Sequence, residues 1–283
     1  LDVSINTALT HLYCTSNQLT SLDVSSNTAL TDLHCSGNQL TSLDVSNNTA
    51  LTIMGCYYNQ LTSLDVSNNT ALTHLYCTSN QLTALDVSAN TALTDLRCNN
   101  NQLTTLDVSN NTALAILECN SNQLTSLDLS ANTALTVLNC FSNQLFHLNM
   151  KNGVTDQLFT FNATNNSLDC IEVNEEDVDY ATENWTYAND NIDEGVGFSV
   201  VCAPEGYTYV PDNNFEQVLI DLGYDDVLND FVLTASISGV TSLDVEAKEI
   251  IDLTGIEGFT ALSTLNCNYN QLTSLDLSNN TCL

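Results

Sequence analysis

The sequence predicts a repeat solenoid, in which short parallel strands of successive coils stack side by side. Three observations predict this fold class. A block of 21 residues recurs with few changes from Leu9 to about Leu148. Within each block, apolar and polar residues alternate as they do in a short strand. One block is too small to bury its own apolar side chains, so only stacked copies, with strands ~4.8 Å apart, can cover them.

The first half of each block has the spacing of a leucine-rich repeat. In the first copy it reads Leu9-x-x-Leu12-x-Cys14-x-x-Asn17-x-Leu19, with a cysteine where the third aliphatic residue usually stands. We expect the strands to line the concave face of the solenoid and the convex side to be mostly irregular. The expected strands are centred on Tyr13, His34, Gly55, Tyr76, Arg97, Glu118 and Asn139.

Two asparagines of each block are expected to be structural. They stand where the chain turns, and an inward amide there can satisfy backbone groups that no strand partner reaches. A catalytic group is needed in one copy only, so a residue repeated in every coil indicates fold and not chemistry. The two ladders are Asn17, Asn38, Asn59, Asn80, Asn101, Asn122 and Asn143, and Asn27, Asn48, Asn69, Asn90, Asn111 and Asn132.

Most of the 11 cysteines follow the repeat. Parallel side chains on neighbouring coils are poorly aimed for a disulfide, and a linear row does not converge as zinc ligands must. We therefore expect buried, reduced thiols that act as small hydrophobic residues. The repeated positions are Cys14, Cys35, Cys56, Cys77, Cys98, Cys119 and Cys140, with Cys267 in the same place of a later copy.

Residues 1–202 are interpreted as the C-terminal part of one leucine-rich-repeat domain. The regular repeats occupy residues 1–150, and residues 151–202 form one irregular last coil and an acidic, aromatic cap that closes the open end. Cys170 and Cys202 lie outside the periodic series, and we expect a disulfide between them to hold the cap. Such a bond indicates an oxidising, extracellular destination.

Residues 203–209, which contain Pro and Gly, are expected to be a linker. Residues 210–283 are expected to form a small helical N-terminal cap and the first repeats of a second domain. Asn213 is the expected N-cap of the cap helix, Glu216 its capping-box partner, and Gly223 its end.

Composition excludes several classes of function. The 283 residues include 3 basic and 34 acidic ones, for a formal net charge of −31. This charge disfavours nucleic acid and anionic membrane surfaces as partners, and no apolar run is long enough to span a membrane. The histidines have no single-copy nucleophile nearby, and no phosphate-binding or metal-ligand motif is present. We expect no enzyme activity and no cofactor apart from a weak calcium hypothesis.

The calcium hypothesis rests on acidic side chains. Asp23, Asp44, Asp65, Asp86, Asp107 and Asp128 form a ladder whose charges must be screened, hydrogen-bonded or bridged by cations. Solvated carboxylates bound by neighbouring Ser and Thr are the default interpretation. Asp225, Asp226 and Asp230 are the weak calcium candidates, although no recognised calcium loop is present.

A binding role is expected where the repeats differ. Tyrosines among Thr, Ser and Asn suit stacking on sugars or filling a pocket on a partner, and Arg97, the only arginine, could pair with an acidic group. The variation also has a period of three coils, which suits a repeating polymer, although recent duplication explains it equally well, and exposed aromatic residues also simply suit strands. The candidates are His11, Tyr13, His34, Tyr57, Tyr58, His74, Tyr76, Arg97 and Phe141.

The repeat LDVSxNTALTxLxCxxNQLTS, the segment from Cys170 to Cys202 and the opening Val210-Pro211-Asp212-x-x-Phe215 resemble secreted leucine-rich-repeat proteins of gliding and gut Gram-negative bacteria. The resemblance implies large surface proteins, often exported by the type IX system and involved in adhesion. We expect a secreted or cell-surface binding module that captures a surface protein or polysaccharide. The alternative is a structural stalk or fibre in which neighbouring copies or domains stack end to end.

Overall fold

The computed structural model describes residues 1–204 and 206–283. The chain forms two compact units, Leu1–Cys202 and Ala203–Leu283. Glu205, which belongs to the predicted linker, lies outside the described residues.

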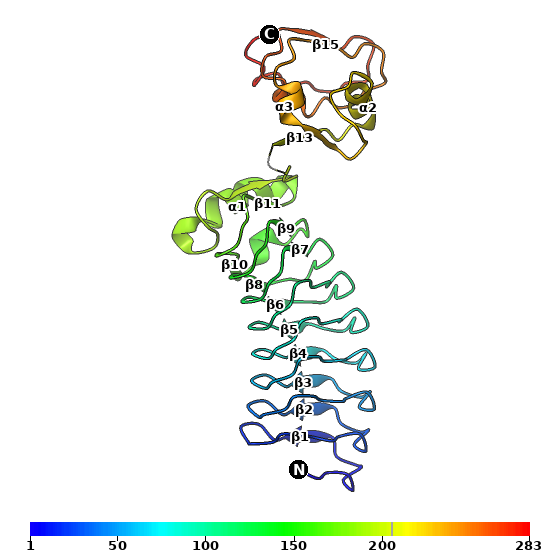
Figure 1. The fold of residues 1–283 in the computed structure, drawn as a ribbon, viewed down its shortest axis with the longest axis vertical. Helices are drawn as coiled ribbons and strands as arrows, with labels where there is room; N and C mark the ends of the chain where they lie inside the picture. Colours follow the sequence, from blue (N-terminus) through cyan, green and yellow to red (C-terminus); the bar gives the residue numbers. More distant parts are fainter. Residues whose placement is uncertain (205) are drawn as a thin grey trace. The chain divides into compact units, whose positions relative to one another are not determined.

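The first unit is a stack of coils that share one parallel sheet of eight strands (Figure 1). Each strand pairs with the same position of the next coil, so that Leu12 is opposite Leu33. The predicted parallel stacking is confirmed, and each strand is centred one residue before the predicted residue. The strands are β1 (His11–Tyr13), β2 (Asp32–His34), β3 (Ile53–Gly55), β4 (His74–Tyr76), β5 (Asp95–Arg97), β6 (Ile116–Glu118), β8 (Val137–Asn139) and β10 (Thr160–Asn162).

A second sheet of four strands forms in the other half of the last coils. The side opposite the eight-stranded sheet is otherwise irregular, as expected, and these short strands are confined to the last coils. Apolar residues alternate there as in a strand, for example Leu127 with Leu129 and Ile171 with Val173, and all four are buried. The strands are β7 (Ser126–Asp128), β9 (His147–Asn149), β11 (Cys170–Glu172) and β12 (Gly197–Ser199), in the order β12-β11-β9-β7.

The core is made by the repeated leucines, valines and cysteines. From the second coil onward the central leucines, such as Leu33 and Leu75, are 0% exposed. In the first coil Leu12 is only half-buried and Asn17 is exposed. The reason is that a complete neighbouring coil covers this coil on one side only. The repeated cysteines are free thiols, as predicted. Burial raises the pKa of Cys56 and Cys98 to about 12, so these thiols stay protonated.

The asparagine ladders have the predicted structural role. Nδ2 of Asn80 donates to the carbonyl oxygens of Cys77 and Cys56, both at 3.1 Å, and its Oδ1 accepts from the N–H of Leu61 at 3.0 Å. In the second ladder, Nδ2 of Asn69 donates to the carbonyl oxygen of Val45 at 3.0 Å. Each amide therefore ties one coil to the coil before it.

The segment after β11 covers the last coil. It contains η2 (Glu175–Asp177), α1 (Val178–Asn184) and η3 (Tyr187–Asn189), while η1 (Thr155–Gln157) precedes β10. Trp185 is 4% exposed and stacks on Phe161 with ring centroids 3.9 Å apart. The predicted disulfide between Cys170 and Cys202 is confirmed, with Cα atoms 5.6 Å apart.

The second unit begins with an antiparallel strand pair, β13 (Tyr207–Tyr209) and β14 (Phe231–Leu233). The prediction of a linker extending to residue 209 is therefore wrong for its last three residues, since Tyr-Thr-Tyr has strong strand preference. The other elements are α2 (Asn213–Asp221), α3 (Thr234–Ile237), β15 (Ser242–Asp244), η4 (Ile256–Gly258) and β16 (Thr264–Asn266). Strands β15 and β16 are parallel, as in the first unit.

The N-cap of α2 is Asp212 and not the predicted Asn213. Asp212 Oδ1 accepts from the N–H groups of Asn214 and Phe215, while Oδ2 accepts from those of Ile251 and Asp252. Burial acts to raise the pKa of Asp212, but these four hydrogen bonds prevail and the pKa is lowered. The second pair of contacts, far away in sequence, explains why local capping rules chose the wrong residue.

Two further predictions for this unit are settled by the structure. Glu216 is not a capping-box partner, because its carboxylate is buried and accepts from the N–H of Asn229 at 2.8 Å. Gly223 lies just beyond the helix with φ +78°, a conformation that favours glycine. Across the described residues, none of the helices combines the length and apolar composition needed to cross a membrane.

Candidate binding surface

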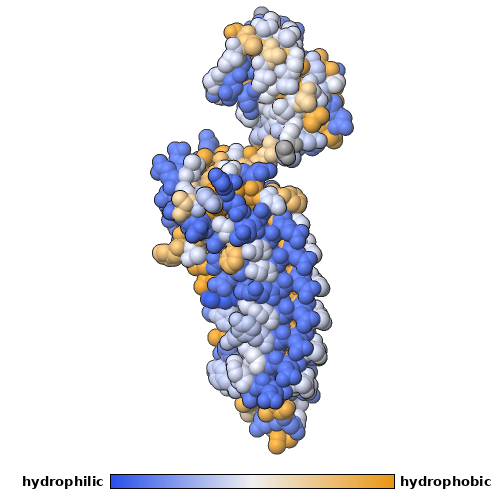
Figure 2. All heavy atoms as spheres, turned by 60° about the vertical axis from the view of Figure 1, so that its left-hand side comes forward, coloured by the Kyte–Doolittle hydropathy of each residue, from blue (hydrophilic) through white to orange (hydrophobic). Residues whose placement is uncertain are grey.

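We name the outward side of the eight-stranded sheet the strand face; it is the surface predicted to be concave. On the face that Figure 2 shows, hydrophilic and neutral residues cover most of the coils of the first unit, whereas apolar residues gather mainly towards its ends. The outward residues form three rows, with one member per coil. The rows are His11, Asp32, Ile53, His74, Asp95, Ile116 and Val137; Tyr13, His34, Gly55, Tyr76, Arg97, Glu118 and Asn139; and Thr15, Ser36, Tyr57, Thr78, Asn99, Asn120 and Phe141.

The strand face contains a hollow of about 460 Å³. Gly55 is the one residue of the middle row without a side chain and lies between His34 and Tyr76 in the sheet, which leaves room for the imidazole of His34 at the edge of the hollow. A Cβ atom at this position would lie 2.9 Å from Nδ1 of His34. The strand-face hollow is lined by His34, Tyr57, Tyr76, Thr78, Arg97, Asn99 and Glu118.

Arg97 is held by a network within the chain. Its Nε and Nη2 donate to the two carboxylate oxygens of Asp95 at 3.0 and 3.1 Å, and its Nη1 donates to Glu118 at 3.4 Å. The guanidinium carbon lies 5.5 Å from the ring centroid of Tyr76. Arg97 therefore already pairs with two carboxylates of its own chain, and its pairing with an acidic group of a ligand stays a prediction.

Tyr76 is fixed in the same network. Its hydroxyl donates to Asp95 Oδ2 at 3.2 Å. Burial, together with the charge of Asp95, raises the pKa of Tyr76 to about 12, so the phenol remains protonated at neutral pH. The ring of Tyr76 and the ion pairs of Arg97 thus form a polar and aromatic surface that contacts within the chain hold in place.

The first two coils repeat this arrangement with different residues. Tyr13 is 64% exposed, and its ring stacks on His34 with centroids 5.0 Å apart. His11 Nε2 lies 3.4 Å from a carboxylate oxygen of Asp32. In both places a tyrosine packs against a basic side chain from the next coil. The three-coil period of the sequence therefore corresponds to a repeated side-chain contact.

Five of the predicted residues do not line the strand-face hollow: His11, Tyr13, Tyr58, His74 and Phe141. Tyr58 follows the strand at a turn position with φ +53° and is 62% exposed, so it does not belong to the strand face. Its ring meets Tyr57 edge-on at 5.6 Å. Phe141 is half-buried at the other end of its row and does not line the hollow.

The sequence predictions missed the carboxylates of the strand face. Asp95 is 6% exposed, and Glu118 also borders the hollow. A charge alternation was visible, because Asp95 and Arg97 are two residues apart on one strand and Glu118 follows Arg97 one coil later. Residues i and i+2 of a strand share a face, so this spacing could have predicted the network.

The aspartate ladder has the default role predicted for it. Asp65 Oδ1 accepts from the N–H and the hydroxyl of Ser67 at 2.9 and 2.7 Å. These hydrogen bonds, the side-chain one first, lower the pKa of Asp65 below its ordinary value. Across residues 1–204 and 206–283, no group of three or more His, Cys, Asp or Glu side chains converges as a metal site would require.

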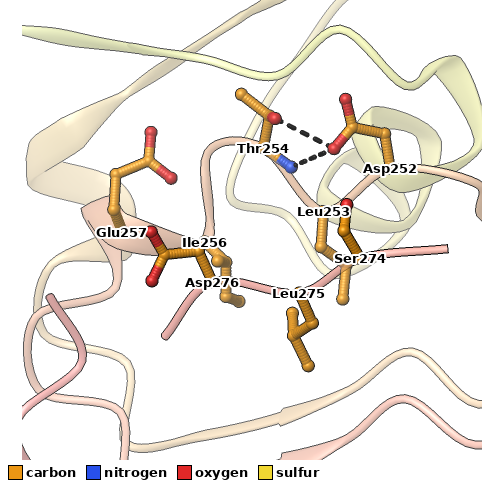
Figure 3. Close-up of a pocket in the computed structure, with 8 residues that line it drawn as sticks. All are labelled: Asp252, Leu253, Thr254, Ile256, Glu257, Ser274, Leu275 and Asp276. Atoms are coloured by element: carbon orange, nitrogen blue, oxygen red, sulfur yellow. Dashed lines mark hydrogen bonds between the residues drawn. The ribbon is translucent and has the colours of Figure 1, made fainter. Parts of the chain in front are cut away.

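The second unit has an acidic hollow of about 240 Å³ (Figure 3). Figure 3 shows the carboxyl groups of Glu257 and Asp276 on one side and that of Asp252 on the other. Asp252 accepts from the N–H and hydroxyl of Thr254, and Asp276 from the N–H of Ser278. These carboxylates serve the local turns, as in the aspartate ladder of the first unit.

Comparisons with known proteins agree with this architecture. The LVIVD repeat family matches residues 35–59 and 98–120. The functional domain of InlJ from Listeria monocytogenes, described as including a cysteine ladder, matches 100% of this chain at 33% identity with a TM-score of 0.56. This protein has the leucine-rich-repeat fold. The leucine-rich-repeat chain spans 58% of that InlJ domain.

Two further matches come from Listeria monocytogenes strain F2365, one of them to internalin J itself. Internalin J of strain F2365 is 38% identical over 73 residues, which are 26% of this chain and 8% of internalin J. Internalin C2 from the same strain shares the fold, with 19% identity and a TM-score of 0.53 over 60% of this chain and 84% of that structure.

Proposed function

We propose that this chain is a non-catalytic capture module whose strand face binds a protein partner. The observation that carries the proposal is the strand-face hollow, which is lined by aromatic, basic and acidic side chains that differ from coil to coil on an otherwise repetitive scaffold. Tyrosine and arginine are enriched among the residues that dominate interface energies, and a hollow can receive one anchoring side chain. Solenoids offer extended surfaces of this kind for binding.

The charges of the strand face favour a partner with basic or neutral residues. One guanidinium, that of Arg97, faces the carboxylates of Asp95 and Glu118. The chain as a whole has a formal net charge of −31. Complementary charge raises the association rate and suppresses acidic partners. A polysaccharide with neutral sugars is the competing ligand, since tyrosine rings also stack on sugar faces.

The proposed location is the cell surface or the extracellular medium. The disulfide between Cys170 and Cys202 supports it, because such bonds persist in oxidising compartments. Export from a Gram-negative bacterium, which the sequence resemblance implies, is part of the same proposal. A structural stalk is the second candidate, and the succession of two units in one chain favours it.

The test is a capture screen of the whole chain against surface proteins and glycans, with matched variants. Tyr57→Ser and Tyr76→Ser remove walls of the hollow, and we expect each to weaken capture by about tenfold or more. Tyr58→Ser is the control, because it removes the neighbouring tyrosine outside the hollow, and we expect less than about a twofold change.

Three outcomes would contradict the proposal. Equal loss in the Tyr57 and Tyr58 variants would place binding outside the hollow. Capture of glycans alone would replace the protein partner by a polysaccharide. Absence of any ligand, together with assembly of the chain into filaments, would support the stalk.

A further inference from the structure

The basic group of the strand-face hollow is already compensated from behind. Nε and Nη2 of Arg97 donate to both carboxylate oxygens of Asp95, at 3.0 and 3.1 Å. The side chain of Asp95 is 8% exposed and does not line the hollow. A ligand in the hollow therefore meets a charged pair whose two members largely neutralise each other.

Glu118 is compensated less completely. Among the described residues, one ion pair reaches its carboxylate: Nη1 of Arg97 lies 3.4 Å from Oε1, and Oε2 accepts no hydrogen bond. The side chain of Glu118 is 24% exposed and lines the hollow. Because one guanidinium faces two carboxylates, the unbalanced negative charge lies at Glu118, where a ligand can reach it.

The backbone of this part of the sheet offers a ligand no free strand edge. Each strand from β2 to β6 pairs with a neighbour on both sides, in the order β1-β2-β3-β4-β5-β6-β8. A partner therefore cannot add a strand here and must be recognised by the side chains of the hollow.

The hollow is longer than one side chain. Its lining residues extend from His34, the last residue of β2, to Glu118, the last residue of β6. Four strand spacings of ~4.8 Å, or ~19 Å in all, separate these two strands. An extended chain advances by ~3.3 Å per residue, so a segment of about six residues matches this length.

A polar group beside Glu118 also suits a peptide. The hydroxyl of Thr78 donates to Oδ1 of Asn99 at 2.6 Å, whereas Nδ2 of Asn99 makes no hydrogen bond among the described residues. Both side chains line the hollow. The amide nitrogen of Asn99 can therefore donate to a carbonyl oxygen of a bound segment.

We propose that the strand-face hollow receives an extended, basic segment of a protein partner, with a lysine or arginine side chain paired with Glu118. This assignment rests on the proposed function, because it names what the hollow of the capture module holds. The carboxylate of Glu118 accepts from the charged head, and the aliphatic stem runs towards the ring of Tyr76. An acidic segment is disfavoured, because it would place like charge beside Glu118.

The experiment selects peptides of about seven residues, slightly longer than the hollow, from a random displayed library on the immobilised whole chain at physiological salt. We expect enrichment of peptides that contain Lys or Arg. These peptides should bind Glu118→Gln about tenfold or more weakly than wild type. The substitution leaves both hydrogen bonds between Arg97 and Asp95 in place, so the network beneath the hollow should persist.

Glu183→Gln is the matched control. It removes an exposed carboxylate from α1, and Glu183 does not line the hollow. Both variants have the same formal net charge, so attraction of basic peptides by the charge of the whole chain would weaken equally in both. We expect the affinity of Glu183→Gln to stay within about twofold of wild type.

Three results would overturn the proposal. One is a library that yields no binder, or only peptides without a basic residue. Another is enrichment of Asp or Glu, which would favour pairing with Arg97. The third is the same affinity for Glu118→Gln as for Glu183→Gln.

The tyrosine variants separate this proposal from the proposed function. If Tyr57→Ser and Tyr76→Ser lose capture while Glu118→Gln retains it, the strand face binds a partner without using a basic residue, and only the assignment to Glu118 fails. If all three variants capture as wild type does, the proposed function fails as well.

Discussion

The turns of the coils, where the asparagine ladders lie, and the strand face come from the same repeat, yet their side chains make different contacts. At the corners each asparagine bonds to backbone groups of two coils, as Asn80 does to Cys77, Cys56 and Leu61. On the strand face, Tyr76 and Arg97 bond to neighbouring side chains instead. The residues that repeat in every coil are therefore those that hydrogen-bond to the backbone of neighbouring coils. The residues that vary are those that face solvent or a ligand.

The largest effect on stability is expected when one asparagine of the first ladder is removed. Asn80→Ala leaves buried carbonyl and N–H groups without partners, and we expect the free energy of unfolding to fall by ~2–5 kcal/mol. Asn99→Ala makes the same chemical change on the strand face, where the side chain binds only the hydroxyl of Thr78, and should cost ~1 kcal/mol or less. Urea unfolding of both variants measures the two changes in unfolding free energy. Equal decreases in the two variants would contradict the special role of the asparagine ladder.

A smaller loss is expected in the cysteine row. Cys77→Ser places a hydroxyl at a position that is 0% exposed, and we expect a cost of ~1–3 kcal/mol in unfolding free energy. Thr78→Ser, at the adjacent half-buried position of the strand face, is the matched control and should change stability by less than ~1 kcal/mol. A neutral Cys77→Ser variant would show that the thiol row is not part of the apolar core.

The aspartate ladder is repeated but exposed, so its contribution should be smaller and dependent on pH. Hydrogen bonds from Ser67 lower the pKa of Asp65 in the folded chain. Its stabilisation is therefore present above the unfolded pKa of about 3.9 and is lost as the pH falls through the folded pKa. Unfolding of Asp65→Asn should differ from wild type near neutral pH and converge with it in acid; a difference independent of pH would contradict this role.

The smallest perturbation is thiol labelling, in which exposed and buried cysteines of the unchanged chain should react at different rates. In the native chain, Cys282 is exposed, whereas the repeated cysteines from Cys35 to Cys140 are 0% exposed. Burial also raises the pKa of the repeated thiols, as for Cys56. We expect Cys282 to label fastest, the half-buried free thiol Cys267 to label next, and the row from Cys35 to Cys140 to stay protected until the first unit unfolds, which mass spectrometry can follow. Rapid labelling of Cys77 in the native chain would refute the packing.

The frame of the fold was readable from the sequence because every coil repeats the same evidence. The spacing of Leu, Cys and Asn predicted the parallel sheet, the buried thiols and the corner amides. Cys170 and Cys202 stood out because they break the 21-residue period. In each case, a position in the repeat determines a position in space.

The errors arose where contacts join residues that no pattern relates. Asp212 caps α2 because it also binds the N–H groups of Ile251 and Asp252. Tyr58 leaves the strand face because its backbone adopts φ +53°. The strand-face hollow depends on how side chains from different coils are oriented towards one another, which composition and periodicity do not report.

The most direct test of the division between corner and face is one paired measurement of unfolding and ligand capture on Asn80→Ala and Tyr76→Ala. We expect Asn80→Ala to unfold at lower urea concentration while its native form captures the ligand as well as wild type. Tyr76→Ala should unfold near the wild-type midpoint and lose capture by about tenfold or more. Loss of stability in Tyr76→Ala equal to that in Asn80→Ala, with capture unchanged, would contradict the account.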